Sequence, residues 1–165
     1  MLECQRDAAV AFQESVLWRA YVAQLVMHNL SESVKQIYDA FRRGDIPAIL
    51  DLLADDVEWE SWADHSGLKA NIPWFRHRHG KAGAAEFFGF AAQMTIHDFQ
   101  VLSIMAGGNQ VAVEFVIDAD VPGGGHFRDE EMHLWTFNDA GKVIRLRHYI
   151  DTVKHIEAAR NWPQA

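Results

Sequence analysis

The stretch EEMHLWTFNDAGKVIRLRHYID, residues 130–151, holds the pattern that decides the fold. In its first part alternate side chains point to opposite sides of an extended chain, so that Glu131, His133 and Trp135 share one side. NDAGK is a turn sequence and the second part alternates again, which predicts two strands joined in a hairpin. Because burying an unpartnered polar group costs several kcal/mol, the side that carries Glu131 and His133 is either exposed to solvent or forms a polar site inside an apolar pocket.

The second strand favours the pocket. Within VIRLRHYID, residues 143–151, His148 falls on the same face as Leu146 and Ile150, in an apolar line that should point inward. The strand that carries His133 is its hairpin neighbour. We therefore expect cross-strand contact between the two imidazoles if both point into the same hollow.

Two helices are predicted upstream of the strands. SESVKQIYDAFRRGD, residues 31–45, repeats apolar residues at helical spacing, with Ser33 and Gln36 spaced as a capping box and Gly44 as the stop. Asp45 is the expected cap of a second helix, which follows after a minimal turn.

The remaining segments complete an α+β pattern. VEWESW, residues 57–62, alternates as a strand, and the long aromatic stretch 63–79 suggests a lid. A third helix is expected after Gly83, and residues 99–120 are typical of a further hairpin. Helices gathered at one end of a mostly antiparallel sheet can cover one of its faces and leave a cone-shaped hollow.

Composition limits the classes of function. The 165 residues, 49% hydrophobic and 23% charged, suit one globular domain with an adequate core. The formal charge of -8 repels a phosphate backbone, so we expect no nucleic-acid partner. The single cysteine, Cys4, excludes an intrachain disulfide. No run approaches the roughly 20 apolar residues of a membrane helix, and residues 1–30 lack a signal-peptide pattern, so we expect a cytoplasmic protein without membrane contact.

We expect three segments along the chain. Residues 1–30 form an N-terminal extension, whose apolar positions between Ala9 and Leu25 permit a helix that packs on the domain or on a partner subunit. Residues 31–155 form the domain, and residues 156–165 form a C-terminal tail.

Three blocks, taken in order, carry a family resemblance: YDAFRRGDIPAILDLLADDVEWE (38–60), GKAGAAEFF (80–88) and HLWTFNDAGKVIRLRHYIDT (133–152). They resemble the SnoaL-like, polyketide cyclase-like branch of the nuclear transport factor 2-like (ketosteroid-isomerase-like) superfamily. The resemblance implies a cystatin-like fold, in which a curved, mostly antiparallel sheet wraps around three helices to form a cone-shaped pocket, here with an extra N-terminal helix. It also implies frequent dimerisation through the outer sheet face.

The superfamily contains isomerases, cyclases, dehydratases, epoxide hydrolases and non-catalytic binding domains, and the fold does not choose among them. The aspartate base and the tyrosine of the steroid isomerases would fall near Ser61 and Ile37, so both are missing. The Arg and two Asp of the limonene-epoxide-hydrolase type would fall at Glu114, Val116 and His148, and none matches.

In the aldol-condensing cyclases of the SnoaL type, a histidine falls at His133 and an acidic residue at His148, so one of the two is retained. An imidazole can perform the same proton transfer, because its pKa lies near 6.5. We therefore expect His148 and His133 to be catalytic, with Glu131 orienting one ring and raising its pKa. The expected substrate-pocket residues are Trp59, Ser61, Trp74, Glu114, Trp135, Leu146 and Ile150.

Structural alternatives stay open at this stage. His133 and His148 could be core histidines satisfied by a carboxylate, and Glu131 could lie on a solvated face. His77 and His79 form an HxH pair without a placed third ligand, so we expect neither a metal nor a cofactor. Three functions remain: acid/base chemistry on a small apolar carbonyl compound, binding of such a molecule without turnover, or protein assembly. A small apolar molecule and a second copy of the chain are the expected partners.

Overall fold

The computed structural model describes residues 2–62 and 71–162, and of residues 2–16 it describes the backbone. The elements follow one another as α1 (Leu2–Arg42), α2 (Ile46–Leu52), β1 (Leu53–Ser61), the 3-10 turn η1 (Pro73–Phe75), β2 (Arg78–His79), α4 (Gly80–Ala91), β3 (Thr95–Gly107), β4 (Gln110–Val121), β5 (Gly125–Phe137), β6 (Val143–Tyr149), α5 (Thr152–Ala158) and η2 (Ala159–Asn161).

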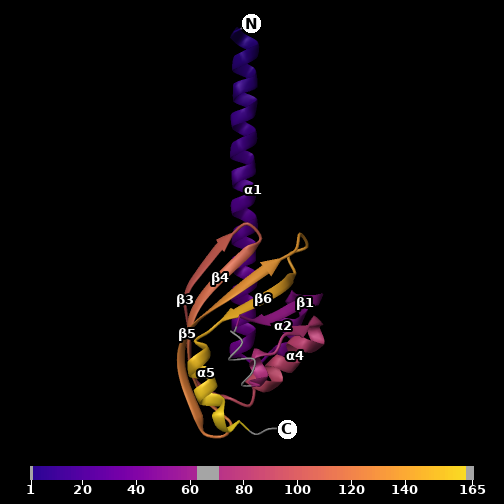
Figure 1. Cartoon of the computed structure of the whole chain (residues 1–165). Helices are drawn as coiled ribbons and strands as arrows, with labels where there is room; N and C mark the ends of the chain where they lie inside the picture. Colours follow the sequence, from indigo (N-terminus) through magenta and orange to yellow (C-terminus); the bar gives the residue numbers. More distant parts are fainter. Residues whose placement is uncertain (1, 63–70, 163–165) are drawn as a thin grey trace.

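The predicted α+β architecture is confirmed. The sheet has the order β2-β1-β6-β5-β4-β3, and of its pairs only β1 with β6 is parallel within the described chain. It curves past one half of α1 and has α2 and α4 beside it, while α5 follows β6 at the opposite end from the start of α1 (Figure 1). The hairpins predicted for residues 99–120 and 130–151 are both present.

The expected helix start near residue 31 is wrong. Helix α1 runs without a break from Leu2 to Arg42, and its first half stands clear of the sheet (Figure 1). Instead of capping a terminus, Ser33 donates its hydroxyl to the carbonyl oxygen of Asn29 one turn earlier, at 3.1 Å. The helix ends as predicted, before Gly44, whose φ of 67° is a left-handed conformation that glycine adopts without strain.

The other helix boundaries show which local signals were sufficient. Asp45 accepts a hydrogen bond from the backbone N–H of Ala48 and caps α2, as predicted. Helix α4 begins at Gly80, three residues before Gly83, after which it was expected to start. Helix α5 was not predicted, although Asp151 caps it by accepting from the backbone N–H of Val153.

Two apolar clusters form the core. The larger one lies between the inner sheet face and the helices, with Val34 and Ile37 of α1 and Trp135 of β5 buried in it. The smaller one joins η1, the start of β5 and α5 around Trp74 and Phe127. A cavity lies where these two clusters meet, because residues of both line it.

Across the described residues, no helix has both the length and the apolar character that a membrane-spanning helix needs. Of the expected lid over 63–79, residues 63–70 lie outside the described part. Trp74 and Phe75, by contrast, are buried in the core.

Candidate functional site

The two histidines singled out in the sequence face each other across the β5–β6 hairpin. His133 and His148 are register partners, and their ring centroids lie 4.4 Å apart in an edge-to-face arrangement. Both rings line an internal cavity of about 80 Å³, whose wall is otherwise mostly aromatic and aliphatic. The cross-strand pair is therefore placed in one largely apolar cavity.

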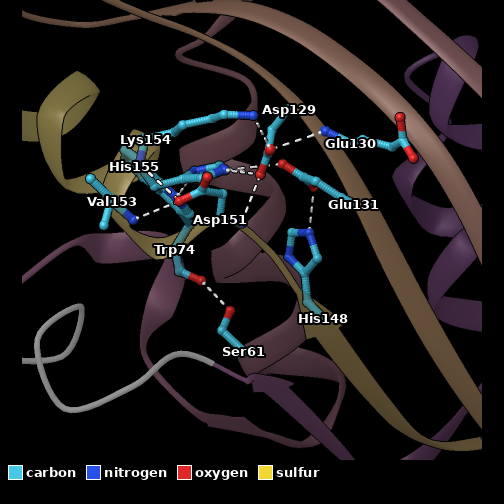
Figure 2. Close-up of polar contacts among 10 residues, drawn as sticks. All are labelled: Ser61, Trp74, Asp129, Glu130, Glu131, His148, Asp151, Val153, Lys154 and His155. Carbon is cyan, nitrogen blue, oxygen red and sulfur yellow. Dashed lines mark hydrogen bonds and ion pairs between the residues drawn. The ribbon is translucent and has the colours of Figure 1, made fainter.

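The cavity includes three of the expected pocket residues, Trp59, Trp74 and Trp135. Ser61 is buried nearby and donates its hydroxyl to the carbonyl oxygen of Trp74 at 3.0 Å, which ties β1 to η1 (Figure 2). Ser61 thus positions a wall of the cavity without lining it.

The remaining three expected pocket residues lie elsewhere. Leu146 faces inward but is packed in the larger core cluster, and Ile150 packs against the smaller one. Glu114 lies with Met105 and Glu130 in a shallow hollow, away from the cavity. Strand alternation explains this position, because the neighbouring Val113 and Phe115 take the inner face of β4.

Glu131 is the centre of a buried polar network (Figure 2). One carboxylate oxygen lies 2.6 Å from Nε2 of His148, and the other lies 3.0 Å from Nε2 of His155. Asp129, two residues earlier on the same face of β5, lies 3.5 Å from the same atom of His155 and 2.8 Å from the Lys154 ammonium. Glu131 therefore bonds to His148 through one carboxylate oxygen and to His155 through the other.

The carboxylates of this network stay ionised. Burial raises the pKa of Glu131, but the adjoining imidazoles of His148 and His155 outweigh burial and bring the pKa below its usual value. The pKa of Asp129 is lowered in the same way, by His155 and Lys154 against burial. The cavity wall thus carries a fixed negative charge beside His148.

The hydrogen-bond donor of Trp74 assigns the tautomer of His155. The indole Nε1–H donates to Nδ1 of His155 at 3.1 Å, so the ring proton lies on Nε2, facing Glu131. Burial lowers the pKa of His155, and its hydrogen bonds to Asp129 and Glu131 raise it above the usual value. A second proton on Nδ1 would nevertheless face the Trp74 N–H, so this arrangement holds a neutral ring.

A second chain of hydrogen bonds assigns the tautomer of His133. The indole of Trp135 donates to the Tyr38 hydroxyl at 3.2 Å, and the hydroxyl's own proton has Nδ1 of His133, 2.7 Å away, as its acceptor among the described residues. Burial raises the pKa of Tyr38 well above its usual value, which keeps this hydroxyl protonated. His133 therefore carries its own proton on Nε2.

Burial and the neighbouring His148 place the pKa of His133 well below 6.5, so its ring is neutral near pH 7.

Besides Nε of Arg78, which is not part of the cavity lining, two buried side-chain nitrogen atoms have no hydrogen-bond partner in the described part of the chain, Nε2 of His133 and Nδ1 of His148. The first carries a proton. The second carries a lone pair in the neutral ring, because the proton of His148 lies on Nε2 toward Glu131. The cavity wall thus presents one free donor and one free acceptor on adjacent imidazoles.

Sequence analysis missed Tyr38, Asp129 and His155. Tyr38 looked like an ordinary member of the apolar helix face, and His155 lay beyond the last predicted strand. Asp129 had a usable signal, because it falls on the same alternating face of β5 as Glu131 and His133.

The buried group Asp129, Glu131 and His155 has ligand atoms within 4.8 Å of one another, which is a spacing that suits a metal ion. The Lys154 ammonium and the Trp74 N–H already satisfy this group. A cation would have to displace the ammonium, so these residues fit a metal poorly.

Comparison with known proteins gives a family and a fold. The profile of the SnoaL-like domain matches residues 34–146. An NTF2-like protein from Burkholderia xenovorans LB400 is 23% identical, with a TM-score of 0.66 over 83% of this chain and 98% of that one. TerC, co-crystallised with polyporic acid, is 25% identical, with a TM-score of 0.67 over 80% and 98%.

An LEH-like epoxide hydrolase of M. tuberculosis is 15% identical, with a TM-score of 0.62 over 82% of this chain and 92% of that one. No curated protein sequence matches the chain.

Proposed function

The chain belongs to the SnoaL-like domain family, and from this premise we propose that it catalyses acid/base chemistry on a small apolar carbonyl compound held in the internal cavity. One observation carries the proposal: buried nitrogen atoms of two adjacent imidazoles present a free proton acceptor and a free proton donor to the same apolar space. Buried polar atoms are rarely left without partners, so such a pair favours a ligand that supplies them.

The proposed reaction begins with proton abstraction. Nδ1 of His148 takes a proton from the carbon next to the carbonyl group, and the electron pair of the broken C–H bond moves onto the carbonyl oxygen. The Nε2–H of His133 donates a hydrogen bond to that oxygen and stabilises the enolate. Glu131, on the other nitrogen of His148, orients the ring and stabilises the imidazolium that forms.

The next step defines the reaction class. Return of the proton to a different carbon gives an isomerisation, and its delivery to a leaving hydroxyl gives a dehydration. Attack of the enolate on a second carbonyl gives a cyclisation. All three use the same donor and acceptor, so the proposal covers this group of reactions.

The cavity supports a small, mostly apolar substrate. Its volume of about 80 Å³ is well below the roughly 150 Å³ of an engineered apolar cavity that admits benzene. A substrate with a ring therefore requires its aromatic walls, such as Trp59 and Phe87, to move. The complex of TerC with polyporic acid supports a small organic molecule as the ligand of this fold.

The test is solvent deuterium exchange at the acidic carbons of a panel of small cyclic and open-chain ketones, followed by proton NMR. We expect exchange that depends on the protein and that falls by about 10²–10⁴-fold in His148→Ala, the range for loss of a general base. His79→Ala is the matched control, because this exposed histidine on β2 also pairs with a carboxylate, that of Glu58.

Two outcomes would contradict the proposal. If ligands of the panel bind but none exchanges, the cavity belongs to a binding protein without turnover. If exchange in His148→Ala equals that of the unmodified chain, the base is another group.

A further inference from the structure

A second group of metal-ligand side chains lies outside the cavity, on the solvent-facing side of β3, β4 and β5. It consists of His97, Asp120 and His126, each about half exposed. Nε2 of His97 lies 2.8 Å from one oxygen of Asp120, and Nδ1 of His126 lies 2.8 Å from the other. All three ligand atoms fall within 4.8 Å of one another.

The sheet fixes this convergence. Asp120 and His126 are register partners on β4 and β5, and His97 reaches them from a bulge in β3 between Ile96 and Asp98. Three ligands on three hydrogen-bonded strands cannot drift apart as ligands on a loop can. Ala119 and Val121, which flank Asp120 on β4, are buried in the core, so the backbone that carries this ligand is fixed by packing on the inner sheet face.

We propose that His97, Asp120 and His126 bind a divalent transition-metal ion of the zinc class, with solvent filling the open positions. Two imidazoles and one carboxylate are a donor set that zinc accepts, and nickel and copper accept imidazole as well.

The surrounding charges favour a cation on balance. Asp118 lies 3.7 Å from Nε2 of His126, and it pairs across the strands with Asp98 on one side and Arg128 on the other. The carboxylates of Asp98 and Asp118 thus adjoin the site, and the guanidinium of Arg128 is the one positive charge among these neighbours. The buried Asp129 group, in contrast, already has an ammonium in the place of a cation.

Isothermal titration of the full chain with zinc chloride alone tests the site. We expect one equivalent to bind, and His97→Ala and His126→Ala each to weaken binding at least about 10-fold. His79→Ala should leave binding unchanged, because that ring pairs with Glu58 without a third ligand atom in the described structure. All three side chains are exposed, so the fold should survive each substitution, and thermal unfolding in chelator checks this.

The absence of zinc binding below about 1 mM would overturn the proposal, and so would binding that neither His97→Ala nor His126→Ala weakens. If Asp129→Asn reduces binding instead, the buried group is the metal site. Deuterium exchange measured in chelator keeps this result separate from the proposed catalytic function.

An independent observation concerns the free half of α1. Its large apolar side chains are exposed by 38–65%, namely those of Leu17, Trp18, Tyr21, Val22, Leu25 and Val26. Arg19 is the only charged residue between positions 17 and 27, although the whole chain carries a net charge of -8. The expected packing of this segment on the domain is not seen for these side chains. An apolar stripe of this size is typical of an interaction site.

We infer that the stripe pairs with the same stripe of a second copy in antiparallel orientation. The row Trp18, Val22 and Val26 is spaced by four residues, so a two-fold axis at Val22 sets the large Trp18 of each copy against the small Val26 of the other. Trp18 and Tyr21 are more than half exposed, so at the roughly 150–250 Å² of a large aromatic side chain they alone offer about 180–300 Å² per copy. With its four aliphatic side chains the stripe stays below the ~800 Å² per partner of a standard interface, which indicates a concentration-dependent dimer.

Sedimentation equilibrium of the full chain tests this pairing. We expect a dimer whose dissociation constant rises at least about 10-fold in the double variant Trp18→Ser, Leu25→Ser. Val153→Ser is the control, because Val153 is equally exposed on α5. A monomer at every concentration would overturn the inference. A dimer that the double variant leaves intact would place the contact on another surface, such as the outer sheet face.

Discussion

Tyr38 links the helical layer to the histidine pair, because its hydroxyl accepts from Trp135 and donates to His133. In Tyr38→Phe both partners become buried polar groups without a partner, at a cost of about 1–3 kcal/mol in the free energy of unfolding. Nδ1 of His133 would also lose its donor, so the proton would distribute over both ring nitrogens. Urea unfolding measures the first effect, and nitrogen-15 NMR of the imidazoles measures the second.

Tyr21→Phe is the control for that change, since the Tyr21 side chain is more than half exposed. We expect its unfolding free energy to stay within about 0.5 kcal/mol of the unmodified chain. Equal stability of Tyr38→Phe and the unmodified chain would mean that the bridge contributes nothing.

His133 makes the free energy of unfolding depend on pH below about pH 6.5. Its folded-state pKa lies well below that value, so the unfolded chain takes up a proton at a higher pH than the folded chain does. The contribution is therefore fully present above about pH 6.5 and is lost as the pH falls below it. Between pH 7 and 5 we expect the unfolding free energy to decrease less in His133→Gln than in the unmodified chain. Parallel urea titrations of the two proteins would contradict this.

At the residue scale, alternation along β5 and β6 was enough to bring His133, His148 and Glu131 together. It could not reach Tyr38 or His155, because their partners are about 95 and 24 residues away in the chain. Such pairings depend on how a helix docks on the sheet, and no local pattern encodes that. Glu114 was misplaced for a different reason. The family resemblance put its side chain in the cavity, whereas the alternation of apolar residues along β4 correctly puts it on the outer sheet face.

At the scale of elements, the turn between β4 and β5 sets the position of α5. A Cβ on Gly125 would lie 1.8 Å from the carbonyl oxygen of Ala158, so these backbones touch because the residue is glycine. In Gly125→Ala the end of α5 must move, and this helix carries His155. We expect a loss of about 1–3 kcal/mol in stability and a weaker hold on Glu131, which reduces deuterium exchange.

Gly107→Ala is the matched control for this change, because a Cβ there meets nothing within 4 Å and the φ of Gly107 is not positive. Its stability and exchange should equal those of the unmodified chain. If Gly125→Ala behaves like the control, the β4–β5 turn does not position α5.

The start of α1 was predicted wrongly and α5 was missed, for different physical reasons. A serine and a glutamine three residues apart indicate a helix start only if the preceding chain leaves the helix, and residues 17–30 are themselves helical. Helix α5 has seven residues, too few for a repeat to stand out, although Asp151 is a good cap.

At the scale of the whole molecule, acid should unfold the chain through the buried carboxylates of β5. The pKa values of Asp129 and Glu131 are lowered from 3.8 and 4.5, so both bind protons more weakly when folded. Their contribution is complete above about pH 4.5 and decreases as the pH falls further. Asp129→Asn should be less stable than the unmodified chain at pH 7 and show a flatter decrease between pH 4.5 and 2.5, measured by circular dichroism.

An equally steep acid transition in the two proteins would assign it to other groups. An exposed acid provides a comparison here, since Asp139→Asn, in the turn after β5, should leave the transition unchanged.

The fold as a whole was predictable because several weak signals agreed: two helices joined at Gly44, a strand, a third helix, and two hairpins in order. The size of the cavity was not, because it depends on how far aromatic side chains such as Trp59, Phe87 and Phe88 fill the hollow. Residue types predict a cone, and only packing determines what volume is left inside it.

The distribution of tryptophan gives the cavity an optical signal of its own. Trp18 and Trp62 are exposed, whereas Trp59, Trp74, Trp135 and Trp162 are buried. Iodide in solution should therefore quench the red-shifted emission of Trp62, and that of Trp18 in the monomer, and leave a blue-shifted component from the rest. Trp59 and Trp135 stand against each other at the cavity wall, with ring centroids 5.9 Å apart. A molecule that enters should change this protected fluorescence, so occupancy can be followed without attaching any dye.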